Sequence, residues 1–263
     1  MTEDYATPQR LAMYLESGWS DFLFEQPNSR LASKDETTPG PYIELVKPVF
    51  FQEVARLAKI WTDEIALSIT SVCDIGGGTG RAIYELDRQI SGIGSLALVE
   101  PSATFCHWAE MLLASRAPLP DLPMVNTAVG PIYVPANGRP EPIPLAEDRL
   151  KILNKNLEAC TGLKNFDLVT CFNVVDRHPR PEDMIFHIKE IMSPEGLLIL
   201  SSPFDFDQNS TPDEDSWIDN LDSLFDNSWE TIGESELFYE FRPFNRKWTR
   251  YSSQVLGKRR KAT

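Results

Sequence analysis

Two kinds of hydrophobic pattern divide the chain near residue 69. Before that point, apolar residues recur at helical spacing over residues 10–24 and again over 49–65, which predicts two helices separated by a turn-forming segment at 28–42. After it, short apolar runs alternate with helical periods, as is typical of a parallel sheet joined by crossover helices. The pattern therefore predicts an N-terminal helical cap, residues 1–68, and an α/β domain, residues 69–263.

Short apolar runs predict the strands of this domain, and longer periodic stretches predict its helices. A closing antiparallel hairpin is predicted at the C-terminus, because two extended segments flank Asn245-Arg246-Lys247. A proline-rich stretch at 130–144 is interpreted as a surface loop, and an acidic stretch at 205–226 as an insertion. The predicted strands are 72–75, 96–100, 124–128, 167–172, 197–201, 236–244 and 248–256, and the predicted helices are 81–90, 103–115, 147–159 and 181–192.

Composition and charge narrow the range of partners. The chain has 263 residues, 42% of them hydrophobic, which is enough for a packed core without metal or disulfide support. Its formal net charge is −14, so its surface repels phosphate, and neither nucleic acid nor a membrane is an expected partner. Without a run of 18 apolar residues or a signal-like start, the chain is expected to be cytoplasmic. The four cysteines fit no metal spacing, so no metal site is predicted.

The most specific chemical signal lies in Val72-Cys73-Asp74-Ile75-Gly76-Gly77-Gly78-Thr79-Gly80. A buried strand there runs into four glycines and then a helix, so a ligand can approach bare backbone amides near a helix N-terminus. Glu100 ends the next strand, followed by Pro101, and its carboxylate can accept hydrogen bonds from ribose hydroxyls. Asp74 would repel a diphosphate but suits a cation. The pattern therefore favours S-adenosylmethionine, a nucleoside that carries an ammonium and a sulfonium.

These residues resemble the first motif of the class I, Rossmann-like S-adenosylmethionine-dependent methyltransferases, hydrophobic-hydrophobic-D-x-G-x-G-x-G. The resemblance extends from residue 69 to the C-terminus and implies a seven-stranded, mostly parallel sheet. The stretch 165–178 lies where that family has its fourth motif, at the carboxyl edge of the sheet. Within the family, the chain is most similar to the methyltransferase domain of ovothiol biosynthesis and to the seven-strand protein-histidine N-methyltransferases. The residues that carry this similarity are 173–177, 188–190, 194–196, 201–204 and 242–260.

The resemblance implies an N-methyltransferase in small-molecule biosynthesis that acts on a small, polar, cationic nitrogen substrate such as an imidazole, a guanidine or an amine. Methylation of a histidine in a protein or peptide remains an alternative, as does a non-catalytic S-adenosylmethionine-binding protein. Carried over by position, Asn173 and Asp176 would orient the acceptor. Because methyl transfer depends mainly on positioning, a carboxylate such as Asp176 suffices to hold an N–H while the other face of the nitrogen stays free. The predicted cofactor-binding residues are Asp74, Gly76, Gly77, Gly78, Gly80, Glu100, Pro101 and Asn173.

Other residues are candidates for catalysis or substrate binding. His178 is a candidate general base because a free imidazole titrates near neutrality, with a surface residue as the alternative. Arg177 is a candidate substrate contact. For Asp176, the alternative is an ion pair with Arg177 or an acid at the start of a helix. In the cap, Tyr14, Trp19 and Phe22 are candidates for an aromatic roof that stacks on a cationic substrate. Packing against the sheet is the alternative for these rings.

Overall fold

The computed structural model describes residues 5–24, 45–127, 130–143 and 149–261. Its helices are α1 (Pro8–Leu23), α2 (Val49–Glu64), α3 (Arg81–Gln89), α4 (Ala103–Leu113) and α5 (Pro181–Ile191). Its strands are β1 (Ser71–Ile75), β2 (Ser95–Val99), β3 (Leu122–Thr127), β4 (Gly130–Val134), β5 (Leu150–Leu153), β6 (Phe166–Phe172), β7 (Met192–Ser202), β8 (Trp229–Phe244) and β9 (Lys247–Arg260). Short 3-10 helices are η1 (Leu157–Ala159), η2 (Val175–Arg177), η3 (Glu214–Ser216) and η4 (Leu221–Leu224).

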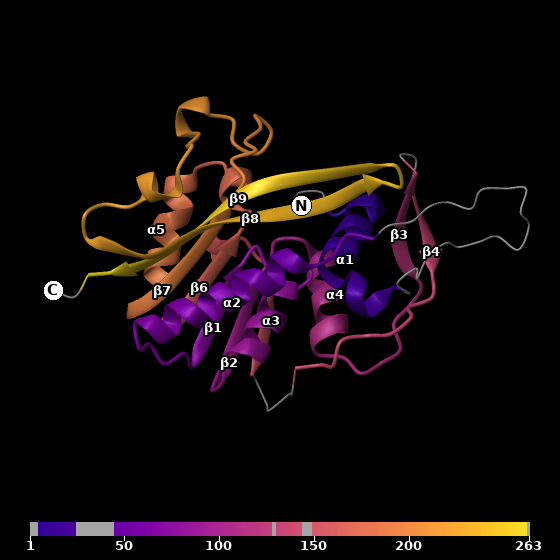
Figure 1. Ribbon diagram of the computed structural model, residues 1–263, viewed down its shortest axis with the longest axis horizontal. Helices are drawn as coiled ribbons and strands as arrows, with labels where there is room; N and C mark the ends of the chain where they lie inside the picture. The colour runs from indigo at the N-terminus through magenta and orange to yellow at the C-terminus, as the bar shows by residue number, and fades with distance from the viewer. Residues whose placement is uncertain (1–4, 25–44, 128–129, 144–148, 262–263) are drawn as a thin grey trace, which may run out of the picture.

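Seven strands form one sheet in the order β5-β2-β1-β6-β7-β9-β8. Neighbouring strands from β5 to β7 are parallel, whereas β9 is antiparallel to both β7 and β8. This arrangement confirms the predicted fold class and the closing hairpin. The hairpin is longer than predicted, since β8 has 16 residues and β9 has 14. Figure 1 shows it, in orange and yellow, running past the sheet toward β3 and β4.

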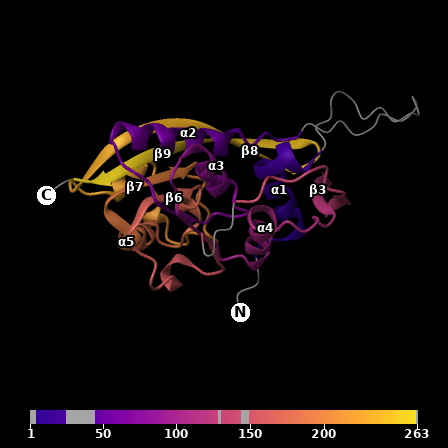
Figure 2. The same cartoon turned by 90° about the horizontal axis from the view of Figure 1, so that it is seen from below.

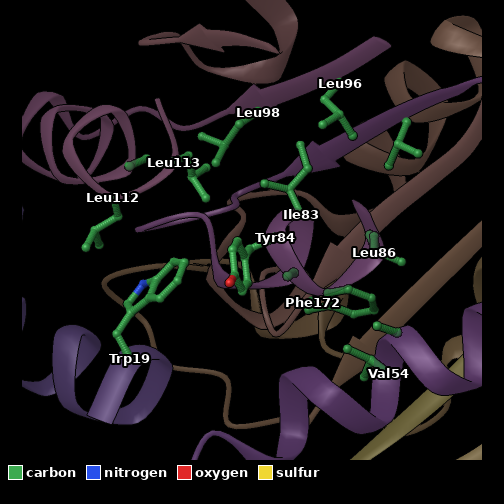
Figure 3. Packing of buried hydrophobic residues seen from close by; sticks show 14 of the residues in the cluster. Trp19, Val54, Ile83, Tyr84, Leu86, Leu96, Leu98, Leu112, Leu113 and Phe172 are labelled. Atoms are coloured by element: carbon green, nitrogen blue, oxygen red, sulfur yellow. The ribbon is translucent and has the colours of Figure 1, made fainter. Parts of the chain in front are cut away.

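Helices cover both faces of the sheet. Figure 2 shows α2 lying along the hairpin, while α5 lies on the other side of β6 and β7. Leucine and isoleucine side chains from α3 and α4 meet those of β2 in a core that also includes Val54 of α2, as Figure 3 shows. The second core packs α5 against the opposite face through Met184, Ile185 and Ile188. None of the helices in the described part of the chain is long and apolar enough to cross a membrane.

A pair of glycines attaches α2 to the hairpin. Gly233 of β8 and Gly257 of β9 are cross-strand partners, and the indole of Trp61 lies against both. A Cβ atom at Gly233 would lie 2.1 Å from Nε1 of Trp61, and one at Gly257 would lie 2.7 Å from its Cε3. Only glycine leaves room for the ring at these two positions, so the glycine pair sets how closely α2 approaches the sheet.

A buried ion pair attaches α1 to the same hairpin. Glu16 of α1 and Arg242 of β8 are 1% and 0% exposed at their side chains. The Arg242 guanidinium donates to both carboxylate oxygens of Glu16, from Nε at 2.7 Å and from Nη2 at 2.6 Å. A third hydrogen bond to Glu16 comes from the backbone amide of Val46 at 3.3 Å. Removing either partner would leave a charge buried without compensation, so the pair fixes α1 in place.

The predicted helix at 147–159 is wrong where the structure describes it. Residues 150–153 form β5, which pairs with β2, and residues 157–159 form η1; residues 147 and 148 lie outside the described part. The backbone amide of Leu96 donates to the carbonyl of Arg149 at 2.7 Å, and that of Glu100 to Leu153 at 3.0 Å. The alternation of Leu150 and Ile152 therefore reflects a strand, because ladder hydrogen bonds to β2 outweigh the local helical pattern.

The strand predicted at 124–128 exists but does not join the main sheet. It is part of β3, which pairs antiparallel with β4 to form a separate sheet of two strands. Residues 130–134 of the predicted proline-rich loop are therefore a strand. The predicted turn-forming segment 28–42 lies outside the described residues, as does residue 128.

Candidate functional site

The backbone between β1 and α3 forms a tight bend, residues 76–80, here called the glycine turn. Gly76, Gly78 and Gly80 have φ values of 67°, 54° and 87°, in the left-handed region that favours glycine. A Cβ atom at Gly76 would lie 2.4 Å from Cγ2 of Val174, and one at Gly77 would lie 2.7 Å from Oδ2 of Asp74. The turn therefore brings bare backbone close to a carboxylate and to the segment after β6.

Asp74, next to the end of β1, is buried with one carboxylate oxygen unsatisfied. It is 1% exposed, and its Oδ1 accepts a hydrogen bond of 2.7 Å from the hydroxyl of Thr170, its register partner on β6. Its Oδ2 has no hydrogen-bond partner among the described residues. Burial and the nearby Glu100 raise the pKa of Asp74 to about 7, and the Thr170 hydrogen bond opposes them. A buried oxygen that lacks a donor is suited to a cationic ligand.

Glu100, directly after β2, joins three parts of the site. It is 1% exposed, and its Oε2 accepts a hydrogen bond from the amide of Gly78 at 3.0 Å. Its Oε1 accepts one from the amide of Ser102 at 2.8 Å and one from the hydroxyl of Tyr5 at 2.6 Å. The Tyr5 hydroxyl therefore binds the same carboxylate that is predicted to accept hydrogen bonds from ribose hydroxyls. Pro101 is exposed, and its carbonyl accepts a hydrogen bond of 2.8 Å from the side-chain Nδ2 of Asn154.

The N-terminal helix α1 places an aromatic side chain over the glycine turn. The ring of Tyr14 stacks on Phe105 of α4, with centroids 4.4 Å apart and planes at 30°. A Cβ atom at Gly78 would lie 3.3 Å from Cδ1 of Tyr14. Tyr5 contacts the same Phe105 ring edge-on at 5.5 Å. Both tyrosines therefore cover the turn in this state, and burial raises the pKa of each above that of an ordinary phenol.

The other two predicted roof residues, Trp19 and Phe22, pack on α3. The indole of Trp19 donates to the hydroxyl of Thr79 at 3.0 Å, and Figure 3 shows its ring beside Tyr84. The guanidinium of Arg81 lies 5.1 Å from the Trp19 ring centroid and 5.2 Å from that of Phe22. The cation that stacks on these rings thus belongs to the chain itself. This placement favours the core-packing alternative for both residues.

The segment after β6 brings polar groups to the same edge of the sheet. Asn173 adopts a left-handed conformation, with φ of 56°, and its amide donates to the carbonyl of Ser201 at 2.9 Å. The hydroxyl of Ser201 donates in turn to Oδ1 of Asn173 at 2.9 Å. Asn173 is thereby fixed to β7. The next residue, Val174, has its side chain against Gly76, so this segment borders the glycine turn.

Asp176 is a second buried carboxylate at this edge. It is 1% exposed, and neither of its oxygens has a hydrogen-bond partner of normal geometry within the described residues. Nη2 of Arg177 lies 3.6 Å from its Oδ2. Burial raises the pKa of Asp176, and the Arg177 guanidinium partly opposes this. Arg177 itself donates to Asp205 at 2.7 Å and to Asp207 at 2.6 Å, so its contacts are with the segment after β7.

His178 has both ring nitrogens engaged away from the glycine turn. Its Nε2 lies 2.7 Å from Oε1 of Glu158, beside η1, and its Nδ1 lies 2.7 Å from the carbonyl oxygen of Arg180. Proton transfer at either nitrogen would first break one of these contacts. The structure therefore places Asn173 and Asp176 on the segment whose Val174 borders the glycine turn, whereas the ring of His178 contacts Glu158, and its catalytic role stays a prediction. Within the described residues, no group of three or more His, Cys, Asp or Glu is arranged to hold a metal ion.

Several residues at the site were not predicted from sequence. Thr170 reaches Asp74 only through the parallel register of β1 and β6, and the position of Asp74 on β1 was the available signal. Asp205 lies in the stretch interpreted as an insertion, and Tyr251 lies in the hairpin; the Tyr251 hydroxyl donates to Asp205 at 3.0 Å. Nothing local in the sequence connects these two residues to Asp176.

Comparisons with known proteins agree with this geometry. A family described as "Methyltransferase domain" matches residues 42–245. No curated protein matches the chain. Among solved structures, a Pyrococcus horikoshii protein provisionally assigned as an RNA methyltransferase is similar, with a TM-score of 0.54 and 12% identity over 94% of this chain and 98% of its own.

Two further solved structures are similar and contain a nucleoside ligand. The N-methyltransferase NodS from Bradyrhizobium japonicum WM9, in complex with S-adenosyl-L-homocysteine, has a TM-score of 0.50 and 9% identity over 81% of this chain and 88% of NodS. The magnesium protoporphyrin IX methyltransferase from Synechocystis PCC 6803, with bound S-adenosylmethionine, has a TM-score of 0.49 and 16% identity over 99% and 100%. At these identities the likeness to the Pyrococcus horikoshii protein and to NodS shows the fold alone.

Proposed function

The chain belongs to the methyltransferase-domain family, whose match spans residues 42–245, and from this premise we propose that it transfers a methyl group from S-adenosylmethionine to a nitrogen of a small, polar, positively charged molecule. The observation that carries the proposal is the unsatisfied Oδ2 of Asp74, buried beside the glycine turn with Glu100 on the next strand. NodS, an N-methyltransferase of the same fold, was crystallised with S-adenosyl-L-homocysteine, which supports this choice of cofactor.

The residues present fit this cofactor. Asp74 offers its unsatisfied oxygen to a cationic group, and the backbone of the glycine turn would be open to the ligand once the Tyr14 ring has moved from over Gly78. Glu100 would accept the ribose hydroxyls once the Tyr5 hydroxyl has moved away from Oε1. When bound, S-adenosylmethionine supplies an electrophilic methyl group on a sulfonium. The chain then has only to hold an acceptor nitrogen in line with that group.

Asp176 is proposed to hold the acceptor. An ionised carboxylate accepts a hydrogen bond from an N–H and leaves the lone pair on the other nitrogen, or on the other face, free to react. Asn173, fixed by Ser201, would present its side chain at the same edge. A strong general base is unnecessary for a displacement that is governed by orientation, which agrees with the engagement of His178 elsewhere.

Isothermal titration of the protein with S-adenosylmethionine and, separately, with NAD tests the cofactor directly. We expect saturable binding of S-adenosylmethionine at one site and no binding of NAD. Mass spectrometry of incubations with candidate imidazoles, guanidines and amines would then detect a mass gain of one methyl group on the acceptor. Binding of NAD without binding of S-adenosylmethionine would overturn the proposal.

Replacing Tyr5 with Phe should strengthen donor binding. The Tyr5 hydroxyl competes with ribose for Glu100, and a hydrogen bond to a charged group contributes roughly 1.5–3 kcal/mol. Water that hydrogen-bonds to Glu100 in the variant compensates for part of this free energy. We therefore expect the dissociation constant for S-adenosylmethionine, measured by isothermal titration, to fall about fivefold to tenfold. Tyr133→Phe, at an exposed tyrosine of β4, is the control and should change nothing. Weaker binding by Tyr5→Phe would instead mean that the phenol assists the donor.

Donor affinity should rise with pH through the titration of Asp74. Its pKa of about 7 means that the carboxylate is mostly protonated at about pH 6 and mostly ionised at about pH 7.5. Glu100 and Thr170 face this carboxylate, and comparison with Asp74→Asn separates the effect of Asp74 from theirs. The affinity for a cationic donor should therefore increase roughly fivefold to tenfold over this range, measured by isothermal titration. Asp74→Asn should bind more weakly and show a flat profile.

The same shift fixes the sign of the stability effect in the unliganded protein. The pKa of Asp74 is raised on folding, from 3.8 to about 7. Folding thus favours the protonated form of Asp74. This contribution to the stability of the folded protein is complete below the unfolded pKa and is lost as the pH rises through about 7. Thermal melting of wild type should fall relative to Asp74→Asn over that interval. Parallel melting curves for both proteins would exclude the shift.

A further inference from the structure

The hairpin β8–β9 presents two stacked aromatic rings next to the segment that carries Asp176. Phe241 and Tyr251 have centroids 5.7 Å apart and planes at 19°. The Tyr251 hydroxyl donates a hydrogen bond to Asp205. Burial is the main cause that raises the pKa of this phenol, and the Asp205 carboxylate raises it further. Nη2 of Arg177 lies 2.7 Å from the same carboxylate of Asp205 and 3.6 Å from that of Asp176, so Asp205 links the Tyr251 hydroxyl to this ion pair. Aromatic faces and carboxylates thus meet at one place.

The charges at this place do not balance. Three carboxylates, those of Asp176, Asp205 and Asp207, lie within 3.6 Å of the single guanidinium of Arg177. Asp205 and Asp207 are about as exposed as Arg177, at 45%, 40% and 41%, whereas Asp176 is buried at 1%. Arg177 makes its hydrogen bonds to Asp205 and Asp207 and leaves Asp176 without one. A positive charge brought next to Asp176 would therefore be attracted by the excess of negative charge.

Contacts connect this place to the glycine turn. Tyr239 is the cross-strand partner of Tyr251 on β9, and its ring lies 6.2 Å from that of Phe241. Tyr239 packs against the same hydrophobic core as Tyr14 of α1, whose ring lies over Gly78. The aromatic side chains of the hairpin and the ring over the turn thus pack against one core.

We propose that Phe241, Tyr251, Asp205 and Asp176 form the acceptor-binding wall of this protein, and that the wall selects an organic cation. This inference rests on the proposed function and names the residues that give it substrate specificity. A cation on the faces of aromatic rings gains roughly 0.5–2 kcal/mol, more when water is excluded, and the buried carboxylate of Asp176 completes its hydrogen bonding. An anion of the same shape would meet three carboxylates and be rejected.

The test compares ligands that share a ring and differ in charge. Histamine and imidazole-4-acetate form one pair, and tyramine and 4-hydroxyphenylacetate form another; each is titrated calorimetrically into the donor-free protein. We expect the cation of each pair to bind at least about tenfold more tightly than the anion. Equal affinities within both pairs, preference for the anions, or no binding by either cation would overturn the proposal.

Variants assign the selectivity to the wall. Tyr251→Ala should weaken binding of the better cation about tenfold, and Asp205→Asn should do so by a similar factor. Tyr251→Phe, which keeps the ring and removes only the hydroxyl, should retain most of the affinity. Phe238→Ala is the matched control, since Phe238 is 62% exposed and its side chain points to the other face of β8. Unchanged cation binding by Tyr251→Ala, in a protein that melts normally, would contradict the assignment.

Donor titrations keep this result separate from the proposed function. S-Adenosylmethionine should bind Tyr251→Ala and Asp205→Asn with the affinity of wild type, because neither residue contacts the glycine turn. If the donor binds and the cations show no selectivity, only the acceptor wall is wrong. If the donor does not bind to wild type, the methyltransferase proposal fails, and selective binding of cations would still support a cation site at the wall.

Discussion

Asp176→Asn is expected to lower the rate of methyl transfer about a thousandfold while leaving the dissociation constant of the donor within about twofold of wild type. The amide has the same shape but loses the charge that would attract a cationic acceptor, and it presents an NH₂ group where a carboxylate oxygen would accept an N–H. Misplacing a bound group by about 1 Å costs roughly 10² in rate, and losing the attraction between the carboxylate and a cationic acceptor adds to that loss. Single-turnover transfer of labelled methyl, measured at saturating donor, reads the rate directly.

The same substitution should make the protein more stable. Asp176 is buried, and neither of its carboxylate oxygens makes a normal hydrogen bond in the described structure, so the Arg177 guanidinium 3.6 Å away offsets only part of the desolvation cost of its ionised form. Burial raises its pKa for the same reason. Loss of activity together with a higher melting temperature would identify a carboxylate that is retained for function.

A control variant guards against a general effect of charge. Asp183→Asn removes an exposed carboxylate of α5 that pairs only with its neighbour Arg180, and it should leave turnover unchanged. Full activity of Asp176→Asn would show that the acceptor is held by other groups. If the donor affinity of Asp176→Asn falls by the same factor as the rate, Asp176 binds the methyl donor and not the acceptor.

Gly78→Val should abolish donor binding, with a dissociation constant at least about a hundredfold higher than that of wild type. The φ of Gly78 is 54°, a region that a β-branched side chain resists at a cost of roughly 1–2 kcal/mol. A Cβ atom there already lies 3.3 Å from the Tyr14 ring, so the two methyl groups beyond it would fill the space above the turn. Isothermal titration with S-adenosylmethionine measures the loss.

Two other variants show whether this loss comes from the turn itself. Gly78→Ala carries the backbone strain with a smaller side chain, so its affinity should lie between those of wild type and Gly78→Val. Gly130→Val is the matched control, because a Cβ atom there meets nothing within 4 Å and valine suits the strand β4. Tight donor binding by a folded Gly78→Val protein would show that the ligand does not approach this part of the turn.

The sequence predicts those parts of the fold that are encoded locally. The run from Val72 to Gly80 combines an apolar strand with glycines at left-handed positions, and both properties belong to the residues themselves. The helix predicted at 147–159 failed because β5 has only four residues, and its pairing with β2 is not visible in its own pattern. Short edge strands are defined by their neighbours more than by their composition.

In the candidate site, too, residues with a local sequence signal were predicted, and residues that depend on the tertiary structure were not. Asp74 and Glu100 follow from their position at strand ends, but their partners Thr170 and Tyr5 depend on register and on the path of the N-terminal segment. The cap aromatics illustrate the limit most clearly. Trp19 and Phe22 have the composition of a cation site, and the structure supplies the cation internally as Arg81. The aromatic residues in the sequence predicted a contact with a cation but did not indicate that the cation is Arg81.

The ion pair between Glu16 and Arg242 has a consequence for how the protein is made. Its two partners are 226 residues apart, so at roughly 5–20 residues per second a ribosome adds Arg242 roughly ten to forty-five seconds after Glu16. During that interval α1 cannot bury its carboxylate at its final position without a large penalty. Because α1 also brings Tyr14 over the glycine turn, the nascent chain completes its ligand-binding surface only after the last hairpin has emerged.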